Sequence, residues 1–234
     1  MSGFLKREGR LLLAAAALIV LMNVPYGRYV LYPFTIFSTW IHEMCHGLAA
    51  IVLGGSIREI EIFSDGSGLA YTARPTGRIP TALVASAGYV GTAVIGGGML
   101  LVRNRRHAGT VGLALLGGAM VLSTLLWVRN LFGVVATPLL GVGLIVATRA
   151  SAEWAGRLYT FLAVTCCLNA ITSIRVLFGS NLVVAGKPAG SSDAQTVADA
   201  LFLPAPVWAA SWMLLAFLLV GGALYSSREP PRRS

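Results

Sequence analysis

Long apolar segments constrain this chain more than any other feature. Each has roughly 18 residues or more, the length that an α-helix needs to cross about 30 Å of hydrocarbon. The sequence therefore predicts an all-α polytopic membrane protein with about six to seven transmembrane helices. The segments cover approximately residues 11–31, 34–54, 80–102, 110–128, 131–148, 158–178 and 206–225.

The composition agrees with a protein that lies in a lipid bilayer. Of the 234 residues, 56% are hydrophobic and only 12% are charged, about half the charge of an ordinary soluble domain. The net charge of +9 comes from Lys and Arg scattered through short loops and both tails, as expected for anchors at lipid headgroups rather than for nucleic-acid binding. We expect one integral-membrane domain over residues 1–234, and the charges leave its orientation open.

The second apolar segment, 34–54, carries the pentad His42-Glu43-Met44-Cys45-His46. Residues four apart share one face of a helix, so His42 and His46 can both direct a ring nitrogen at one Zn²⁺ ion. Glu43 lies about 100° round the helix, where it can act on a water molecule without binding the metal. Ionisable side chains are costly in a membrane helix and are usually functional there. The alternative is a pair of polar side chains hydrogen-bonded inside a bundle.

Residues 56–74 form the one stretch of the sequence with a β pattern. Ile60 and Ile62 alternate with Glu59 and Glu61, and the turn residues 64–68 precede a second extended run. The hairpin either simply connects two spans or presents a strand edge that binds an extended substrate. On the second interpretation, Ile60 and Ile62 are the candidate substrate-binding residues.

The next apolar segment is rich in small residues, including Gly88, Gly91 and the run 96–98. Small residues allow helix backbones to approach closely within lipid. We expect this segment to pack tightly against the metal-binding helix.

A polar loop at 179–205 offers a third metal ligand, since a catalytic zinc site usually has three protein ligands and water. Ser192 and Gln195 fit a capping box that begins a short helix. An anionic third ligand would compensate the metal charge, and the aspartates of the chain are Asp193, Asp199 and Asp65. We choose Asp193 because it begins the short helix between two spans, and Asp199 and Asp65 are the alternatives.

Taken together, these features resemble the site-2 protease family of intramembrane zinc metalloproteases, in its smaller bacterial-type branch. The similarity rests on the pentad, the hairpin after it, the glycine-rich span and the late Asp-bearing segment, in this order. The chain lacks the Leu-Asp-Gly motif that carries the third ligand in other members.

This resemblance implies an endopeptidase that hydrolyses peptide bonds within or near transmembrane segments of membrane proteins, in a bacterial cell membrane. It implies Zn²⁺ on His42, His46 and an aspartate, with Glu43 as the catalytic base. The alternative is a non-proteolytic metal-binding scaffold or transporter. A pure binding site needs no general base, so Glu43 favours the enzyme. The sequence indicates neither the substrate nor the oligomeric state.

Overall fold

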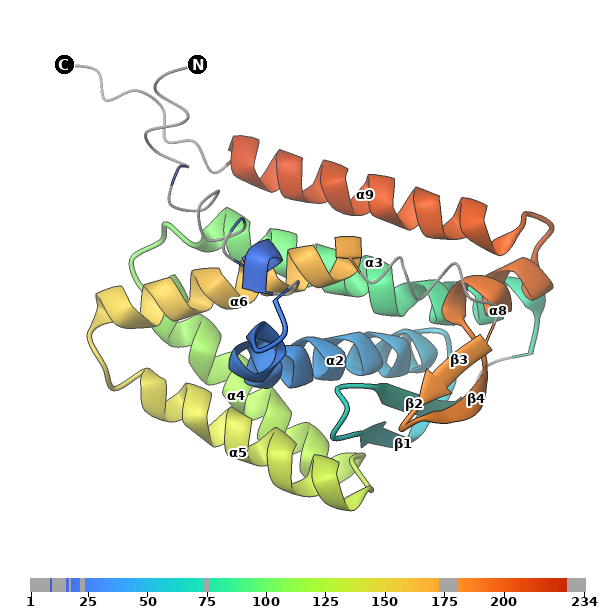
Figure 1. The fold of residues 1–234 in the computed structure, drawn as a ribbon, viewed down its shortest axis with the longest axis horizontal. Helices are drawn as coiled ribbons and strands as arrows, with labels where there is room; N and C mark the ends of the chain where they lie inside the picture. The colour runs from blue at the N-terminus through green and yellow to red at the C-terminus, as the bar shows by residue number, and fades with distance from the viewer. Residues whose placement is uncertain are drawn as a thin grey trace.

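The computed structural model describes residues 24–73, 76–172 and 181–226, together with residues 9, 16 and 18–21. Helices dominate these residues, as predicted, and two small hairpins accompany them (Figure 1). The helices are α2 (Gly27–Val52), α3 (Arg78–Val102), α4 (Ala108–Leu126), α5 (Leu131–Ala147), α6 (Ala152–Thr172), α8 (Asp193–Ala200) and α9 (Ala205–Ser226). The strands are β1 (Ser56–Ile62), β2 (Gly68–Ala73), β3 (Asn181–Val184) and β4 (Lys187–Ser191).

Helix α2 lies in the middle of the bundle, between α3 and the β1–β2 hairpin (Figure 1). Its apolar side chains Ile36, Phe37 and Ile41 are buried in the main core. The predicted break between the first two apolar segments is wrong, because α2 begins at Gly27 and continues through Pro33. Pro33 lies in the second turn, where a proline removes one intrahelical hydrogen bond and its ring crowds the carbonyl four residues earlier, so the rest of α2 must offset this cost.

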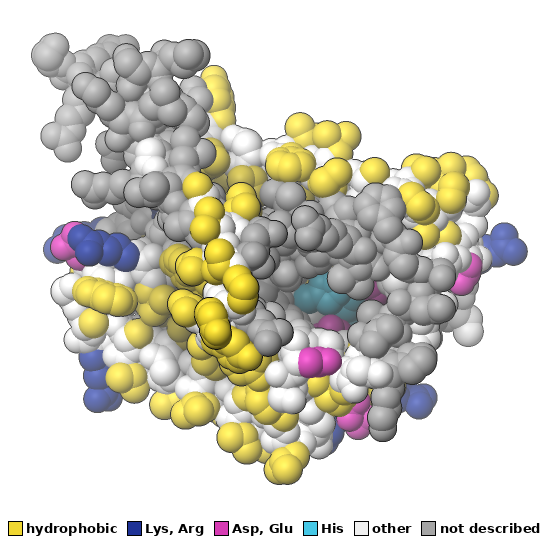
Figure 2. All heavy atoms as spheres, viewed as in Figure 1, with side chains coloured by type: hydrophobic (Ala, Val, Ile, Leu, Met, Phe, Trp, Pro, Cys, Tyr) yellow, Lys and Arg dark blue, Asp and Glu magenta, His cyan; other side chains and the backbone are white. Residues whose placement is uncertain are grey.

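Three helices of the described residues, α3, α4 and α9, are long and apolar enough to cross a membrane. Apolar side chains are exposed along the outer faces of α4, α5 and α9, for example Leu115, Leu125, Leu139 and Leu218, and Figure 2 shows such side chains spread over the surface. Lipid is the solvent in which such a surface is stable. A total of six to seven spans stays a prediction, since α5 is a shorter apolar helix.

The hairpin predicted at 56–74 is present as β1 and β2, which pair antiparallel. Two side chains on one face of α2 bind the turn of this hairpin by hydrogen bonds. Tyr32 Oη donates to the Ser64 carbonyl at 2.7 Å, and Thr39 Oγ1 donates to the Gly66 carbonyl at 2.6 Å. These bonds hold β2 along the face of α2 that carries Glu43.

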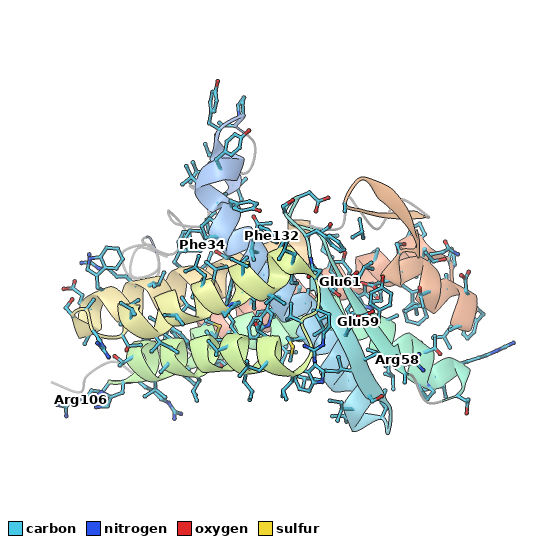
Figure 3. The ribbon with its side chains drawn as sticks, turned by 90° about the horizontal axis from the view of Figure 1, so that it is seen from below. Phe34, Arg58, Glu59, Glu61, Arg106 and Phe132 are labelled. Atoms are coloured by element: carbon cyan, nitrogen blue, oxygen red, sulfur yellow. The ribbon has the colours of Figure 1, made fainter. Side chains whose placement is uncertain are left out.

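The outer edge of β1 is occupied by the link between α4 and α5. The Ile60 amide donates to the Trp127 carbonyl at 2.9 Å, and the Arg129 amide donates to the Ile60 carbonyl at 3.1 Å. The side chain of Asn130 bonds both backbone groups of Ile62, and in Figure 3 the start of α5 lies beside this end of β1. The short link therefore acts as a third, partial strand and protects the edge.

A second hairpin, β3 and β4, lies within the loop predicted at 179–205, where the sequence analysis expected no β structure. Its two turn residues, Ala185 and Gly186, have φ of 51° and 73°, the left-handed conformations of a tight hairpin turn. Pro188 and Gly190 disfavour a strand by composition, which is why the pattern was not evident. The hairpin leads directly into α8.

Candidate metal centre

Three side-chain atoms from two distant parts of the chain converge beside α2. The Nε2 atoms of His42 and His46 lie 3.0 Å apart. Asp193 Oδ2 lies 3.2 Å from the first of these nitrogens and 3.3 Å from the second. Among the residues that the structure describes, these three form the group able to hold a metal ion.

The capped start of α8 places Asp193 in this group. Ser192 is the N-cap residue, and its Oγ accepts from the Gln195 amide at 3.3 Å. Ala194 and Val197, on the apolar face of α8, are fully buried in a cluster with residues of α3. The cap fixes the first turn and the buried face fixes its rotation, so the Asp193 side chain is directed at α2.

The ring of His46 is held in one tautomer by α3. Its Nδ1 lies 2.7 Å from the carbonyl oxygen of Val84, which can only accept, so Nδ1 carries the proton. The Nε2 lone pair then faces His42 and Asp193 and is free to bind a metal. A ligand histidine that donates its other N–H to a carbonyl is the usual arrangement in metal sites.

Gly88 of α3 covers the site at very short range. A Cβ added there would lie 2.4 Å from His46 Nε2 and 2.5 Å from His42 Nε2. No side chain fits at such distances, so glycine is required for α3 to lie against the two imidazoles. The predicted packing of the glycine-rich span on the metal-binding helix is confirmed.

The three donor atoms fit zinc. Zinc bonds of about 2.0–2.1 Å in a tetrahedron separate neighbouring donors by roughly 3.3 Å, and the three distances here are 3.0, 3.2 and 3.3 Å. Burial raises the pKa of Asp193, but the adjacent His46 and His42 outweigh this effect and hold its pKa well below the usual range. Two imidazoles and one carboxylate leave one position of a tetrahedron for water or substrate.

Glu43 lies beside the three donor residues but is not one of them. Its side chain is buried, with 6% of its surface exposed. The backbone amide of Ala70 in β2 lies within hydrogen-bonding reach of its carboxylate. A Cβ added to Gly68 would come within 2.8 Å of Glu43 Oε1, so β2 passes directly over the carboxylate.

The edge of β2 that faces Glu43 has backbone groups directed away from β1. Ile60 and Ile62 use their N–H and C=O groups on the link between α4 and α5. Residues opposite each other in antiparallel strands alternate between exchanging two hydrogen bonds and exchanging none. Ala70 and Gly68, opposite Ile60 and Ile62, are therefore of the second kind and direct their backbone groups outward.

The substrate-binding role predicted for Ile60 and Ile62 does not fit this arrangement. Both side chains are 0% exposed, and the outer edge of β1 is already paired. The alternation of Ile and Glu was interpreted correctly as a strand, but its apolar side faces the core. The sequence could not show which of the two strands lies at the open edge.

The alternative aspartates lie elsewhere. Asp199 is exposed, about 120° round α8 from Asp193, and accepts from Gln195 Nε2 at 2.7 Å. Asp65 stays in the hairpin turn, where Ser67 donates to it through its amide and its hydroxyl. Burial raises the pKa of Asp65, but the hydrogen bonds from Ser67 and from further backbone amides together outweigh this effect, so its pKa is lowered.

Two aromatic residues that no sequence pattern indicated, Tyr89 and Trp212, support the site. The ring of Tyr89 meets the His42 ring edge to face, with centroids 4.6 Å apart. Trp212 of α9 stacks on Tyr89 at 5.5 Å. Together they fix the orientation of the His42 ring, and Figure 2 shows histidine side chains in a hollow of the surface. The position of Tyr89 directly after Gly88 is the one signal that could have indicated it.

The comparison with known families agrees with this site. A model of the Peptidase M50B-like family matches residues 11–223, so the match includes all three donor residues and Glu43. No curated protein and no solved structure matches the chain. The resemblance inferred from the pentad and the later Asp-bearing segment is confirmed at the level of the family.

Proposed function

Because the chain belongs to the Peptidase M50B-like family, we propose that it is an intramembrane zinc endopeptidase. Its substrates would be membrane proteins, hydrolysed within or near their transmembrane segments. The observation that carries the proposal is the convergence of His42, His46 and Asp193 beside a buried Glu43. A bacterial cell membrane is the proposed location, from the resemblance to the bacterial-type branch.

Each residue has a distinct role in the proposed reaction. His42, His46 and Asp193 would hold Zn²⁺, which supplies Lewis acidity to the scissile carbonyl and to a water molecule. Glu43 accepts the proton of the attacking water and then transfers it to the leaving amine. The Val84 carbonyl and the Tyr89 ring keep the two imidazoles oriented throughout.

The edge of β2 that faces Glu43 suits the substrate backbone. An extended segment that displaces the Ala70 amide from the Glu43 carboxylate and pairs with the outward backbone groups of Gly68 and Ala70 would run past Glu43. Such pairing gives affinity without requiring a particular sequence. It would also hold the substrate extended, as hydrolysis requires, because a helical segment keeps its carbonyls in internal hydrogen bonds. We therefore assign substrate alignment to β2 rather than to Ile60 and Ile62.

The variant Glu43→Gln tests the proposal most directly. It keeps the size of the side chain and removes the base, so zinc content should stay near that of the wild type. Hydrolysis of a reporter transmembrane helix in proteoliposomes should fall by about 100-fold or more. If wild type and variant both bound zinc and neither cleaved a broad panel of reporters, the metal-binding scaffold would be the better interpretation.

A further inference from the structure

A cavity lies between α2, α6 and the helical residue Leu18, about one helical turn from His42. Its volume is about 40 Å³, and a water molecule needs roughly 10–15 Å³ by the same measure. The cavity has room for about three waters. Its lining residues are Leu18, Leu31, Phe34, Thr35, Ser38, Thr165, Leu168 and Asn169.

Ser38 is the group that distinguishes this cavity from an apolar void. It is 1% exposed, and its Oγ has no hydrogen-bond partner among the described residues. A buried hydroxyl without a partner is costly, and such groups are usually satisfied by ordered water. Ser38 also precedes His42 by four residues, so both lie on one face of α2.

The two threonines of the cavity do not satisfy Ser38. Thr35 Oγ1 donates to the Leu31 carbonyl at 3.2 Å, and Thr165 Oγ1 donates to the Phe161 carbonyl at 2.9 Å. Their protons are used within their own helices, but their oxygen lone pairs can still accept. A water molecule bound to Ser38 therefore has acceptors around it, as a stable internal water requires.

We propose that this cavity is a water site, with Ser38 as its main ligand, inside the membrane-embedded part of the bundle. Water at this position lies about one helical turn from His42 along α2, beside the polar side chains of Thr35, Thr165 and Asn169. A role in supplying the water that the reaction consumes rests on the proposed function; the water site itself does not.

Thiol labelling tests the site without any measurement of activity. In a background with Cys45, Cys166 and Cys167 changed to Ala, the variant Ser38→Cys is reconstituted in lipid nanodiscs. A small charged methanethiosulfonate reagent, which reacts with hydrated thiolates, should label it at least tenfold faster than it labels Ser123→Cys. Ser123 is the matched control because it is also 1% exposed, while its Oγ is bonded to Trp40 Nε1 and to the Met120 carbonyl.

Labelling of Ser38→Cys as slow as that of Ser123→Cys would overturn the proposal, because it would show a dry cavity. Equally fast labelling of both would overturn it too, because reaction would then follow opening of the whole bundle. The variant Ser38→Ala gives a second measurement. Loss of a hydrated hydroxyl should lower the Tm, whereas removal of an unsatisfied one from a dry cavity should leave the Tm unchanged or raise it.

Discussion

Asp193 Oδ2 lies 3.2 Å from His42 Nε2, although 151 positions separate the two residues. Nothing local to either residue produces this contact. It depends on α8 packing against α3 while α3 packs against α2, so the third donor is supplied by tertiary structure. A small change at Asp193 therefore tests the architecture of the site as well as its chemistry.

We expect Asp193→Asn to weaken zinc binding by about tenfold or more, since the amide removes the anionic donor. Zinc affinity, measured by competition with a chromogenic chelator, is the readout. Asp199→Asn is the matched control, because Asp199 belongs to the same helix and is exposed away from the three donor atoms. A larger effect at Asp199 than at Asp193 would contradict the assignment.

Gly88→Ala should remove zinc binding even though it changes no donor. The added methyl group would lie 2.4 Å from His46 Nε2, so α3 or the imidazoles must move. Gly98→Ala is the control, because a Cβ at Gly98 in the same helix meets nothing within 4 Å. Zinc content measured by atomic absorption on both purified variants checks this. Full zinc occupancy in Gly88→Ala would mean that α3 does not lie over the site.

Local patterns were enough to predict much of this site. The pentad identified His42, His46 and Glu43 because all three lie on one continuous helix, where sequence spacing determines geometry. The capping box at Ser192 identified the start of α8 for the same reason. Asp193 was chosen as the third ligand because it begins that helix. The partners that orient the site, Val84 and Tyr89, were not predicted, because no spacing rule relates them to α2.

The hairpin shows the limit of such reasoning more clearly. Alternation correctly predicted that residues 56–74 form two strands, and it places Ile60 and Ile62 on one side of β1. It carries no information about which side faces solvent or which edge is open. Those properties depend on Trp127, Arg129 and Asn130, about seventy residues later in the chain. They lie in the link between α4 and α5, for which no sequence pattern predicts such a role.

We expect Ile60→Lys to cause a general loss of folded protein, with zinc content and any activity reduced in parallel. The side chain is 0% exposed, and a buried unpaired charge destabilises strongly. Tyr71→Lys is the matched control on the paired strand, where the side chain is 43% exposed. Yield after detergent extraction and size-exclusion chromatography, with zinc per chain, checks the difference. Normal folding of Ile60→Lys with a selective loss of cleavage would restore the substrate role of β1.

The N-cap of α8 provides the last prediction. Ser192 is 1% exposed and its hydroxyl caps the helix that begins with Asp193. Removing such a cap costs about 0.5–2 kcal/mol of helix stability, and disorder in the first turn would spread the positions of the Asp193 carboxylate. Ser192→Ala should therefore weaken zinc binding by several-fold, up to about tenfold, less than the loss of the donor in Asp193→Asn.

Ser192→Thr separates this capping role from simple packing, because threonine can still accept from the Gln195 amide. It should recover most of the zinc affinity that Ser192→Ala loses. Thr196→Ala, in the same helix but outside the cap, should have little effect. If Ser192→Thr and Ser192→Ala bound zinc equally weakly, the volume of the side chain rather than the cap would determine where Asp193 lies.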